Sequence, residues 1–145
     1  MEDIYTLIDS FIVCKFSRGT YYKELEDMTK LYNLVTGFEI TPEAMKKAGE
    51  RINNVAKIFN IREGLGRKDD TLPYKVMHQP ITDEGPSKGA YVTQEELDLL
   101  LNDYYAARGW TREGIPTAEK LKELGMDDLI HIVEGKIGKA EEAEE

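Results

Sequence analysis

The hydrophobic positions of this chain recur mostly every three to four residues, which is the spacing of amphipathic helices. Residues 2–14 are apolar on nearly every side, and they predict a helix that is buried in several directions. A second apolar stripe predicts a helix that ends at Gly37, since glycine readily closes a last helical turn. The members of this stripe are Tyr21, Leu25, Met28, Tyr32 and Val35.

A third helix is predicted to begin at Thr41-Pro42. Thr is a favourable N-cap residue, and proline fits the first helical position. We expect this helix to run to about Arg62 and to stop near Gly64. Its predicted buried face consists of Met45, Ala48, Ile52, Val55, Ala56 and Phe59.

Three further helices are predicted in the second half of the chain. Thr93-Gln94-Glu95-Glu96 is a capping box, and it predicts a helix that is closed by Gly109. Thr117 is the predicted N-cap of the next helix, which Gly125 ends. A last short helix fits residues 127–134.

Residues 64–92 lack helical periodicity and are rich in glycine and proline. A structureless loop of this length is unusual inside a compact domain. The loop contains Leu72, Tyr74, Val76, Met77 and Ile81, which make it too apolar for a solvated linker. We therefore expect it to be ordered by packing on its own helices or on a partner. A short strand or hairpin at residues 75–78 is an alternative.

The predicted fold is all-α: an irregular single domain of about five to six helices over residues 1–135, with a long ordered loop at 64–92. An acidic tail over residues 136–145 is expected to be disordered. The formal net charge of −9 argues against nucleic-acid binding, which needs clustered positive charge. No stretch approaches the roughly 20 apolar residues that span a membrane. The acidic start, Met1-Glu2-Asp3, is unlike a signal peptide, so a cytoplasmic location is expected.

The scarcity of cysteine and histidine limits the chemistry of this chain. Cys14 is its one cysteine, and one thiol cannot complete a disulfide, a zinc site or an iron–sulfur site within the chain. His78 and His131 show no metal-ligand or triad spacing, and we interpret both as surface or packed groups. The composition therefore excludes a self-contained metal centre.

Residues 59–73 carry a specific signature. Phe59-Asn60-Ile61-Arg62-Glu63-Gly64, followed by Arg67-Lys68-Asp69-Asp70-Thr71-Leu72-Pro73, resembles the C-terminal helical region of tungsten-containing aldehyde:ferredoxin oxidoreductases. Later pieces agree in order and spacing, namely Gly85-Pro86, Arg108-Gly109-Trp110 and Gly114-Ile115-Pro116-Thr117. The resemblance extends over about residues 1–130.

The same family carries an Asp-x-x-Gly-Leu-Cys element, and Asp9-Ser10-Phe11-Ile12-Val13-Cys14 resembles it. The resemblance implies that Asp9, Cys14 and Lys15 bind cofactor. Asp9 would accept hydrogen bonds from pterin nitrogens, and Cys14 would be the last ligand of a 4Fe-4S cluster whose other ligands lie on another segment. Ile12 stands where the family has glycine, which argues against a close approach of this backbone to a pterin.

The resemblance also implies a function for the whole enzyme. That enzyme oxidises an aldehyde to a carboxylate at tungstopterin, a molybdopterin-type cofactor, and passes the electrons through the cluster to ferredoxin. This chain would line the substrate channel and cover the cluster, with an N-terminal cofactor-binding domain or subunit as its partner. Alone, it is expected to hold no cofactor and to be catalytically incompetent. The alternative is a stand-alone helical interaction module that has lost the redox chemistry, and Ile12 and Met1 favour that alternative.

Several candidate residues also have a structural interpretation. Cys14 is alternatively a small buried residue on an apolar helix, and Asp9 a helix-face carboxylate paired with a Lys or Arg. The charged residues at 62–70 are interpreted as structural, holding the loop by charge-assisted hydrogen bonds, with a catalytic role as the minor alternative. The aromatic residues at 104, 105 and 110 are interpreted as core rather than as a binding platform.

Overall fold

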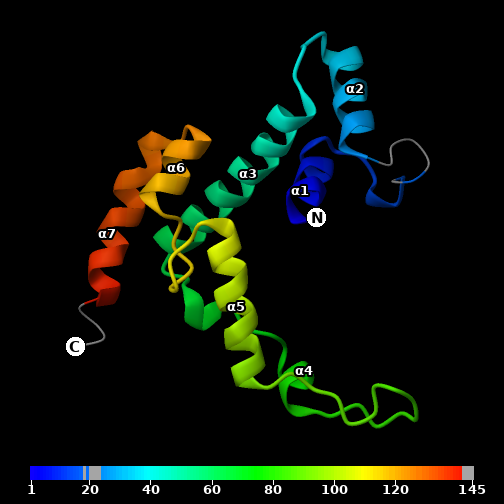
Figure 1. Ribbon diagram of the computed structural model, residues 1–145, viewed down its shortest axis with the longest axis vertical. Coiled ribbons are helices and arrows are strands. Elements are labelled where there is room, and N and C mark those ends of the chain that lie inside the picture. Colours follow the sequence, from blue (N-terminus) through cyan, green and yellow to red (C-terminus); the bar gives the residue numbers. More distant parts are fainter. Residues whose placement is uncertain (18, 20–23, 142–145) are drawn as a thin grey trace. The chain divides into compact units, whose positions relative to one another are not determined.

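A computed structural model of the chain describes residues 1–17, 19 and 24–141 (Figure 1). Its helices confirm the predicted all-α class, and within the described residues β-pairing is limited to one isolated bridge between Trp110 and Pro116. The chain divides into two compact units. The first comprises Met1–Lys57 and Leu124–Met126, and the second comprises Ile58–Glu123 and Asp127–Glu145. The single domain expected over residues 1–135 stays a prediction.

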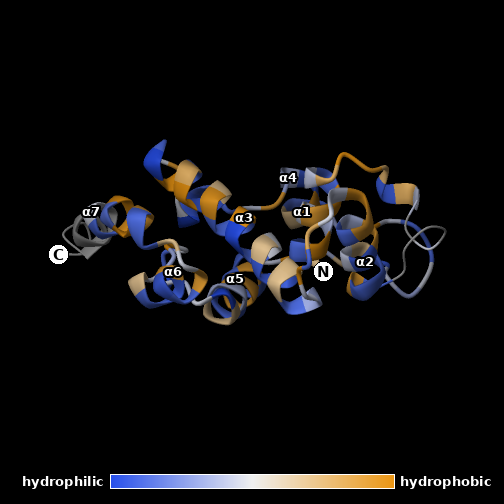
Figure 2. Ribbon diagram, turned by 90° about the horizontal axis from the view of Figure 1, so that it is seen from above, coloured by the Kyte–Doolittle hydropathy of each residue, from blue (hydrophilic) through white to orange (hydrophobic). Residues whose placement is uncertain are grey.

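The first unit is built from α1 (Glu2–Ser10), the short 3-10 helix η1 (Lys15–Ser17), α2 (Leu25–Thr36) and most of α3 (Pro42–Arg62). The three α-helices enclose one hydrophobic cluster, because each turns apolar residues toward the other two. In Figure 2 the hydrophobic residues of α1 and α3 stand out in orange. The fully buried members of the cluster are Leu7, Ile8, Met28 and Met45.

Helix α1 packs closely against α3 at Gly49. A Cβ atom at this position would come within 2.5 Å of the carbonyl oxygen of Asp3, so a larger residue would push the two helices apart. Asn53 fixes the register of the pair: its amide nitrogen donates to the Asp3 carboxylate at 2.7 Å, and its amide oxygen accepts from the Thr6 hydroxyl at 2.8 Å. These contacts hold α1, and with it the segment that follows α1, in one position.

Helix α1 ends at Ser10, before residue 14 where its end was predicted. Ile12 has a φ of +58°, which lies in the left-handed region and leaves the path of a right-handed helix. The segment from Phe11 to Cys14 is therefore a turn and a short irregular stretch. The prediction of a continuous apolar helix was wrong here, because hydrophobic spacing does not reveal a backbone reversal.

The ends of α2 and α3 agree with their predictions. Helix α2 is closed by Gly37, whose φ is +75°. At the start of α3 the hydroxyl of Thr41 accepts a hydrogen bond from the N–H of Ala44 at 3.2 Å, as expected for an N-cap. Helix α3 then continues to Arg62. Tyr21, the first residue of the stripe predicted for α2, lies outside the described residues.

The buried face of α3 differs from the predicted one. Four of the residues predicted to be buried are exposed, namely Ile52 (37%), Val55 (50%), Ala56 and Phe59 (52%). The helix instead buries Asn54, Ile58 and Ile61. Asn54 remains satisfied because its amide donates to the carbonyl oxygen of Glu50 at 2.9 Å. The helix carries apolar residues on two stripes, and tertiary contacts decide which stripe is buried.

The second unit contains the end of α3 and the helices of the remaining chain. These are η2 (Arg67–Asp69), α4 (Tyr74–His78), α5 (Gln94–Arg108), α6 (Ala118–Leu124), η3 (Asp127–Leu129) and α7 (Ile130–Glu141). Its buried hydrophobic residues come from every part of the unit: Ile58, Ile61, Met77, Leu97, Tyr105, Trp110, Ile115, Leu121 and Val133.

The start and end signals of α5 and α6 are confirmed. At the start of α5 the Thr93 hydroxyl accepts from the N–H of Glu96 at 3.2 Å, and the Glu96 carboxylate accepts from the N–H of Thr93 at 2.8 Å. Gly109 and Gly125 close the two helices with φ values of +69° and +68°. The hydroxyl of Thr117 accepts from a backbone N–H in the first turn of α6 at 3.2 Å.

The region 64–92 is ordered through its own short helices and backbone contacts. Residues 75–78 belong to α4, so the alternative of a strand or hairpin there was wrong. Beyond α4, the N–H of Ile81 donates to the carbonyl oxygen of Ala90 at 3.1 Å, and Gly89 donates back to Ile81 at 2.8 Å.

Helix α7 differs from its prediction in length. It continues to Glu141, past residue 134 where its end was expected, and residues 142–145 of the predicted tail lie outside the described residues. Across the described ranges, no helix combines the length and hydrophobicity needed to cross a bilayer.

Candidate functional site

The three residues that the family resemblance assigns to cofactor binding lie together where α1 ends. Asp9 is in the last turn of α1, Cys14 is in the irregular stretch after it, and Lys15 opens η1. The ammonium nitrogen of Lys15 is 3.9 Å from Oδ1 of Asp9, and these two side chains are 51% and 67% exposed. Cys14 is exposed as well. An exposed ion pair of this kind contributes little stability, so both charged groups remain accessible to a binding partner.

A small set of contacts holds this segment. Ser17 fixes the backbone of Cys14, because its N–H and its hydroxyl both donate to the Cys14 carbonyl oxygen, at 3.0 and 2.5 Å. The Lys15 nitrogen also lies 4.8 Å from the centre of the Tyr5 ring, within the range of a cation–π contact. The backbone around Cys14 is thus tied down while its thiol faces outward.

The exposure of Cys14 overturns its structural interpretation. A cysteine that packs as a small apolar residue is buried, whereas this thiol is accessible and lies outside any helix. An accessible thiol can form the thiolate that binds a metal. The alternative for Asp9 was a helix-face carboxylate paired with a Lys or Arg, and Lys15 is such a cation.

The residues present fit one ligand position of an iron–sulfur cluster and not a whole cluster site. Such a cluster takes about four thiolates, and this chain has one cysteine. Among the residues that the structure describes, no group of three or more His, Cys, Asp or Glu residues could hold a metal ion. A cluster at Cys14 therefore requires ligands from another polypeptide segment.

Ile12 retains a backbone conformation that favours glycine. Its φ of +58° costs a residue with a Cβ roughly 1–2 kcal/mol relative to an ordinary conformation. The Ile12 side chain is 94% exposed, so the surrounding fold neither buries it nor compensates the strain by packing. The difference from the family pattern thus adds a bulky apolar side chain at the surface and leaves the left-handed turn in place.

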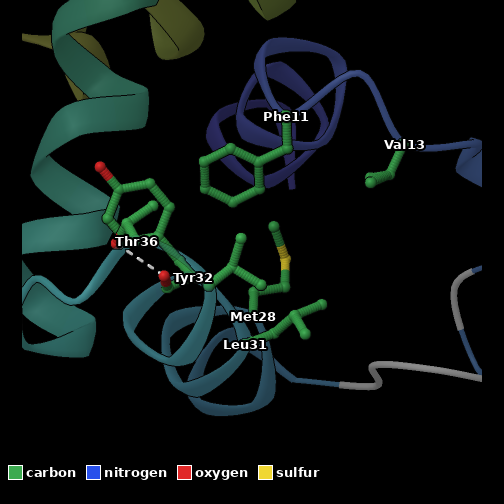
Figure 3. Close-up of a pocket in the computed structure, with 7 residues that line it drawn as sticks. Phe11, Val13, Met28, Leu31, Tyr32 and Thr36 are labelled. Carbon is green, nitrogen blue, oxygen red and sulfur yellow. Dashed lines mark hydrogen bonds between the residues drawn. The ribbon is translucent and has the colours of Figure 1, made fainter.

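An apolar groove that was not predicted from the sequence adjoins this turn. It lies in the first unit between the end of α1 and helix α2, and it encloses about 290 Å³ (Figure 3). The ring of Phe11 points from α1 toward Tyr32 and Met28 on α2, and the Phe11 and Tyr32 rings stack at 5.4 Å. Its lining residues are Phe11, Val13, Met28, Leu31, Tyr32, Val35 and Thr36.

The signature at residues 62–70 has a structural role, as predicted. The guanidinium of Arg67 donates to the side-chain oxygen of Asn102 at 2.9 Å, to the backbone oxygen of Arg112 at 2.7 Å, and to a carboxylate oxygen of Asp98 at 3.2 Å. Because Asp98 and Asn102 lie on α5, these bonds attach the start of the long loop to that helix.

Asp70 makes the second attachment of this signature to α5. Its carboxylate accepts a hydrogen bond from the hydroxyl of Tyr105, a residue that is only 1% exposed. Burial, reinforced by this hydrogen bond, raises the pKa of Tyr105 well above its ordinary value. Tyr105 therefore stays protonated and keeps donating to Asp70.

The aromatic residues near the end of α5 form core rather than an open platform. Tyr105 and Trp110 are buried, with ring centres 6.0 Å apart, and Tyr104 covers the Trp110 ring edge-on at 5.6 Å. Tyr104 itself is 37% exposed. His78 is an exposed group that stacks on Tyr74 at 4.3 Å, and His131 is exposed.

The sequence model for "Aldehyde ferredoxin oxidoreductase, domains 2 & 3" matches residues 1–126. The tungsten-containing aldehyde ferredoxin oxidoreductase of Pyrococcus furiosus is 40% identical over 129 residues, which are 88% of this chain and 20% of that protein. The enzyme of the same name from Pyrococcus abyssi is 38% identical over 130 residues, 89% of this chain and 20% of that protein. The chain thus spans about a fifth of the length of these curated relatives.

A solved structure gives the same fold. The active-site complex BamBC of benzoyl coenzyme A reductase, with bound 1,5-dienoyl-CoA, superposes with a TM-score of 0.60 and 29% identity over 74% of this chain and 15% of that chain. Fold and sequence together define a helical domain that is similar to the C-terminal part of these relatives. The chain belongs to the aldehyde ferredoxin oxidoreductase family.

Proposed function

We propose that this chain is the C-terminal helical part of a cytoplasmic tungstopterin aldehyde:ferredoxin oxidoreductase-like enzyme. In this proposal Cys14 supplies one ligand to a 4Fe-4S cluster that is held mainly by an N-terminal cofactor-binding domain or subunit. The observation that carries the proposal is the exposed cluster of Asp9, Cys14 and Lys15 at the end of α1. An accessible thiol, on the stretch that follows an accessible carboxylate, suits a group that arrives from outside this chain.

Each residue of the cluster has a distinct part in this proposal. When bound, the cofactors supply the redox chemistry that converts an aldehyde to a carboxylate and delivers electrons to ferredoxin. Asp9 accepts hydrogen bonds from pterin N–H groups, and the Cys14 thiolate binds one iron. Lys15 lies beside the Asp9 carboxylate, where it balances the charge and orients the acceptor oxygens. The chain also covers the cluster and lines the substrate channel.

The relatives support the need for a partner. The family match is to domains 2 and 3, and the chain spans about a fifth of the curated relatives. With one cysteine, the chain supplies one of about four thiolates. The isolated chain is therefore expected to be inactive, and activity is expected only in the assembly with the cofactor-binding partner.

A second candidate function is a helical interaction module without redox chemistry. The observation that favours it is Ile12, whose branched side chain is 94% exposed at the position where the family has glycine. In that case the chain would bind a partner that holds neither tungsten nor a cluster.

The test is an anaerobic isolation of the tagged chain from cells that encode it, grown with tungstate. Tungsten and iron are measured in the isolate by mass spectrometry, and aldehyde-dependent reduction of a viologen dye is assayed. We expect both metals and the activity with the native chain, and loss of the activity with Cys14→Ser. The matched control is Ser87→Ala in the loop of the second unit, which should retain both. A folded chain that brings neither metal with it would refute the proposal and favour the interaction module.

A further inference from the structure

We propose that the apolar groove between α1 and α2, together with the exposed turn after α1, is the docking surface for the cofactor-bearing polypeptide. This inference rests on the proposed function and names the surface through which it operates. The term docking surface is used below for the groove lined by Phe11, Val13, Met28, Leu31, Tyr32, Val35 and Thr36, together with Ile12, which lies in the sequence between two of these residues.

The docking surface is unusually apolar for a part of the molecule that faces solvent. None of the residues that line the groove carries a charge. Tyr32 and Thr36 are its two polar side chains, and the Thr36 hydroxyl is already used, because it donates to the backbone oxygen of Tyr32 at 2.7 Å (Figure 3). The groove therefore offers contact area to apolar side chains and little that would orient a polar ligand.

Large hydrophobic side chains of this surface are exposed. On the turn, Ile12 is 94% exposed. On α2, Leu31 and Val35 are 45% and 78% exposed. A contiguous exposed patch of this kind marks an interaction site, whereas scattered single residues do not.

The position of Asp9 and Cys14 identifies the occupant. Residues 10–13 lie between them in the sequence, and two of these, Phe11 and Val13, also line the groove. A polypeptide that holds a cofactor against both Asp9 and Cys14 must therefore pass over this turn and the adjoining edge of the groove. Its contacting segment should be hydrophobic, because the groove presents no charge for it to pair with.

A second copy of this chain does not meet the same requirement. Two copies would bring two cysteines, whereas the cluster takes about four thiolates. The curated relatives, by contrast, are about five times as long as the matched segment, and that additional length can supply the missing ligands. The occupant is therefore the cofactor-bearing polypeptide.

The experiment places a carboxylate in the groove and at a matched position elsewhere. Leu31→Glu and Val35→Glu alter the docking surface without touching Asp9, Cys14 or Lys15. The control is Leu99→Glu, since Leu99 is a 62% exposed leucine on α5 in the second unit. Each tagged variant is isolated anaerobically from the cells that encode the chain, and tungsten per tagged chain is measured. Circular dichroism checks that each variant keeps its helices.

We expect the tungsten content per tagged chain to fall about tenfold or more in Leu31→Glu and Val35→Glu. The content of Leu99→Glu should stay within about twofold of the native value. If the native chain retrieves tungsten and the groove variants retain as much as Leu99→Glu, the docking surface is wrong while the proposed function stands. If the folded native chain retrieves no tungsten, the proposed function fails and the inference fails with it. A mass by light scattering of twice 16.5 kDa for the purified chain, halved by Val35→Glu, would assign the groove to a second copy and overturn the inference.

Discussion

The carbonyl oxygen of Asp3 lies 2.5 Å from the position that a Cβ atom on Gly49 would occupy. This close approach sets the distance between α1 and α3, and it thereby positions the turn that carries Cys14. Alanine at a helical glycine usually stabilises a protein by up to about 1 kcal/mol, but here the new methyl group would meet backbone atoms that cannot move aside.

Gly49→Ala should therefore lower the free energy of unfolding by about 1–3 kcal/mol, measured by urea denaturation. The matched control is Gly135→Ala, because Gly135 is a helical glycine in α7 with no atom within 4 Å of its virtual Cβ. The control should be neutral or stabilising by up to about 1 kcal/mol. Equal effects of the two substitutions would mean that the contact between Asp3 and Gly49 does not determine the packing of α1.

Ile12→Gly should raise the stability of the chain. Ile12 adopts a φ of +58°, and glycine occupies that region without the penalty of a Cβ atom. Its side chain is 94% exposed, so little packing is lost. We expect a gain of about 0.5–1 kcal/mol in the free energy of unfolding, after the entropy that glycine adds to the unfolded chain. The control Val13→Gly, at a neighbouring residue without a positive φ, should lose stability. A lower free energy of unfolding for Ile12→Gly would contradict the left-handed conformation of Ile12.

Tyr105→Phe should destabilise the second unit. The substitution removes the hydroxyl that donates to the Asp70 carboxylate, in a site where Tyr105 is only 1% exposed. A buried hydrogen bond to a charged group is worth about 1.5–3 kcal/mol, and we expect a loss of that size in thermal unfolding. Tyr91→Phe is the control, since Tyr91 is 50% exposed, and it should change stability by less than about 0.5 kcal/mol. Similar losses of stability for both variants would mean that the hydrogen bond between Tyr105 and Asp70 does not hold residues 62–70 on α5.

The capping box of α5 should make the stability of that helix depend on pH. Hydrogen bonds from the backbone N–H and hydroxyl of Thr93 lower the pKa of Glu96 from 4.5. A carboxyl group with a lowered pKa stabilises the folded state fully above its unfolded pKa, and this contribution is lost as the pH falls through the folded value. Glu96→Gln removes the titrating group but keeps a residue that can cap.

The measurement is thermal unfolding from pH 6 to pH 3. The native chain should lose more stability over this range than Glu96→Gln. Glu95→Gln, which removes a carboxylate from the same turn but leaves the capping pair intact, should behave like the native chain. An identical pH dependence for the native chain and Glu96→Gln would show that the Glu96 charge does not stabilise α5.

The parts of the fold that depend on neighbouring residues could be predicted from the sequence. Thr41-Pro42 and the capping box at Thr93 mark helix starts, and Gly37 and Gly109 mark helix ends, because the groups that satisfy a helix terminus lie within a few residues of it. The burial of particular faces could not be predicted in the same way. Ile52 and Val55 are as apolar as Ile58, but only the packing of the whole unit determines which of them is covered.

The candidate site likewise has a local part that the sequence predicts and a part that depends on packing between distant segments. Asp9, Cys14 and Lys15 are close in the sequence, so a local turn suffices to bring the charged groups of Asp9 and Lys15 within 3.9 Å. The groove, by contrast, needs Phe11 and Val13 to meet residues of α2, and the turn at Ile12 that brings them there breaks a pattern that otherwise predicts a helix. A left-handed residue with a branched side chain leaves no signal in the hydrophobic spacing, so the groove emerges only from the structure.

The central claim is that Cys14 binds an iron–sulfur cluster held mainly by another polypeptide segment. The most direct measurement is the low-temperature electron paramagnetic resonance spectrum, with iron quantification, of the anaerobically isolated and reduced assembly. The account predicts about four iron atoms per assembly and a cluster signal with the native chain, and a loss of iron with an altered signal in Cys14→Ser. An unchanged iron content and an unchanged cluster signal in a folded Cys14→Ser assembly would contradict it.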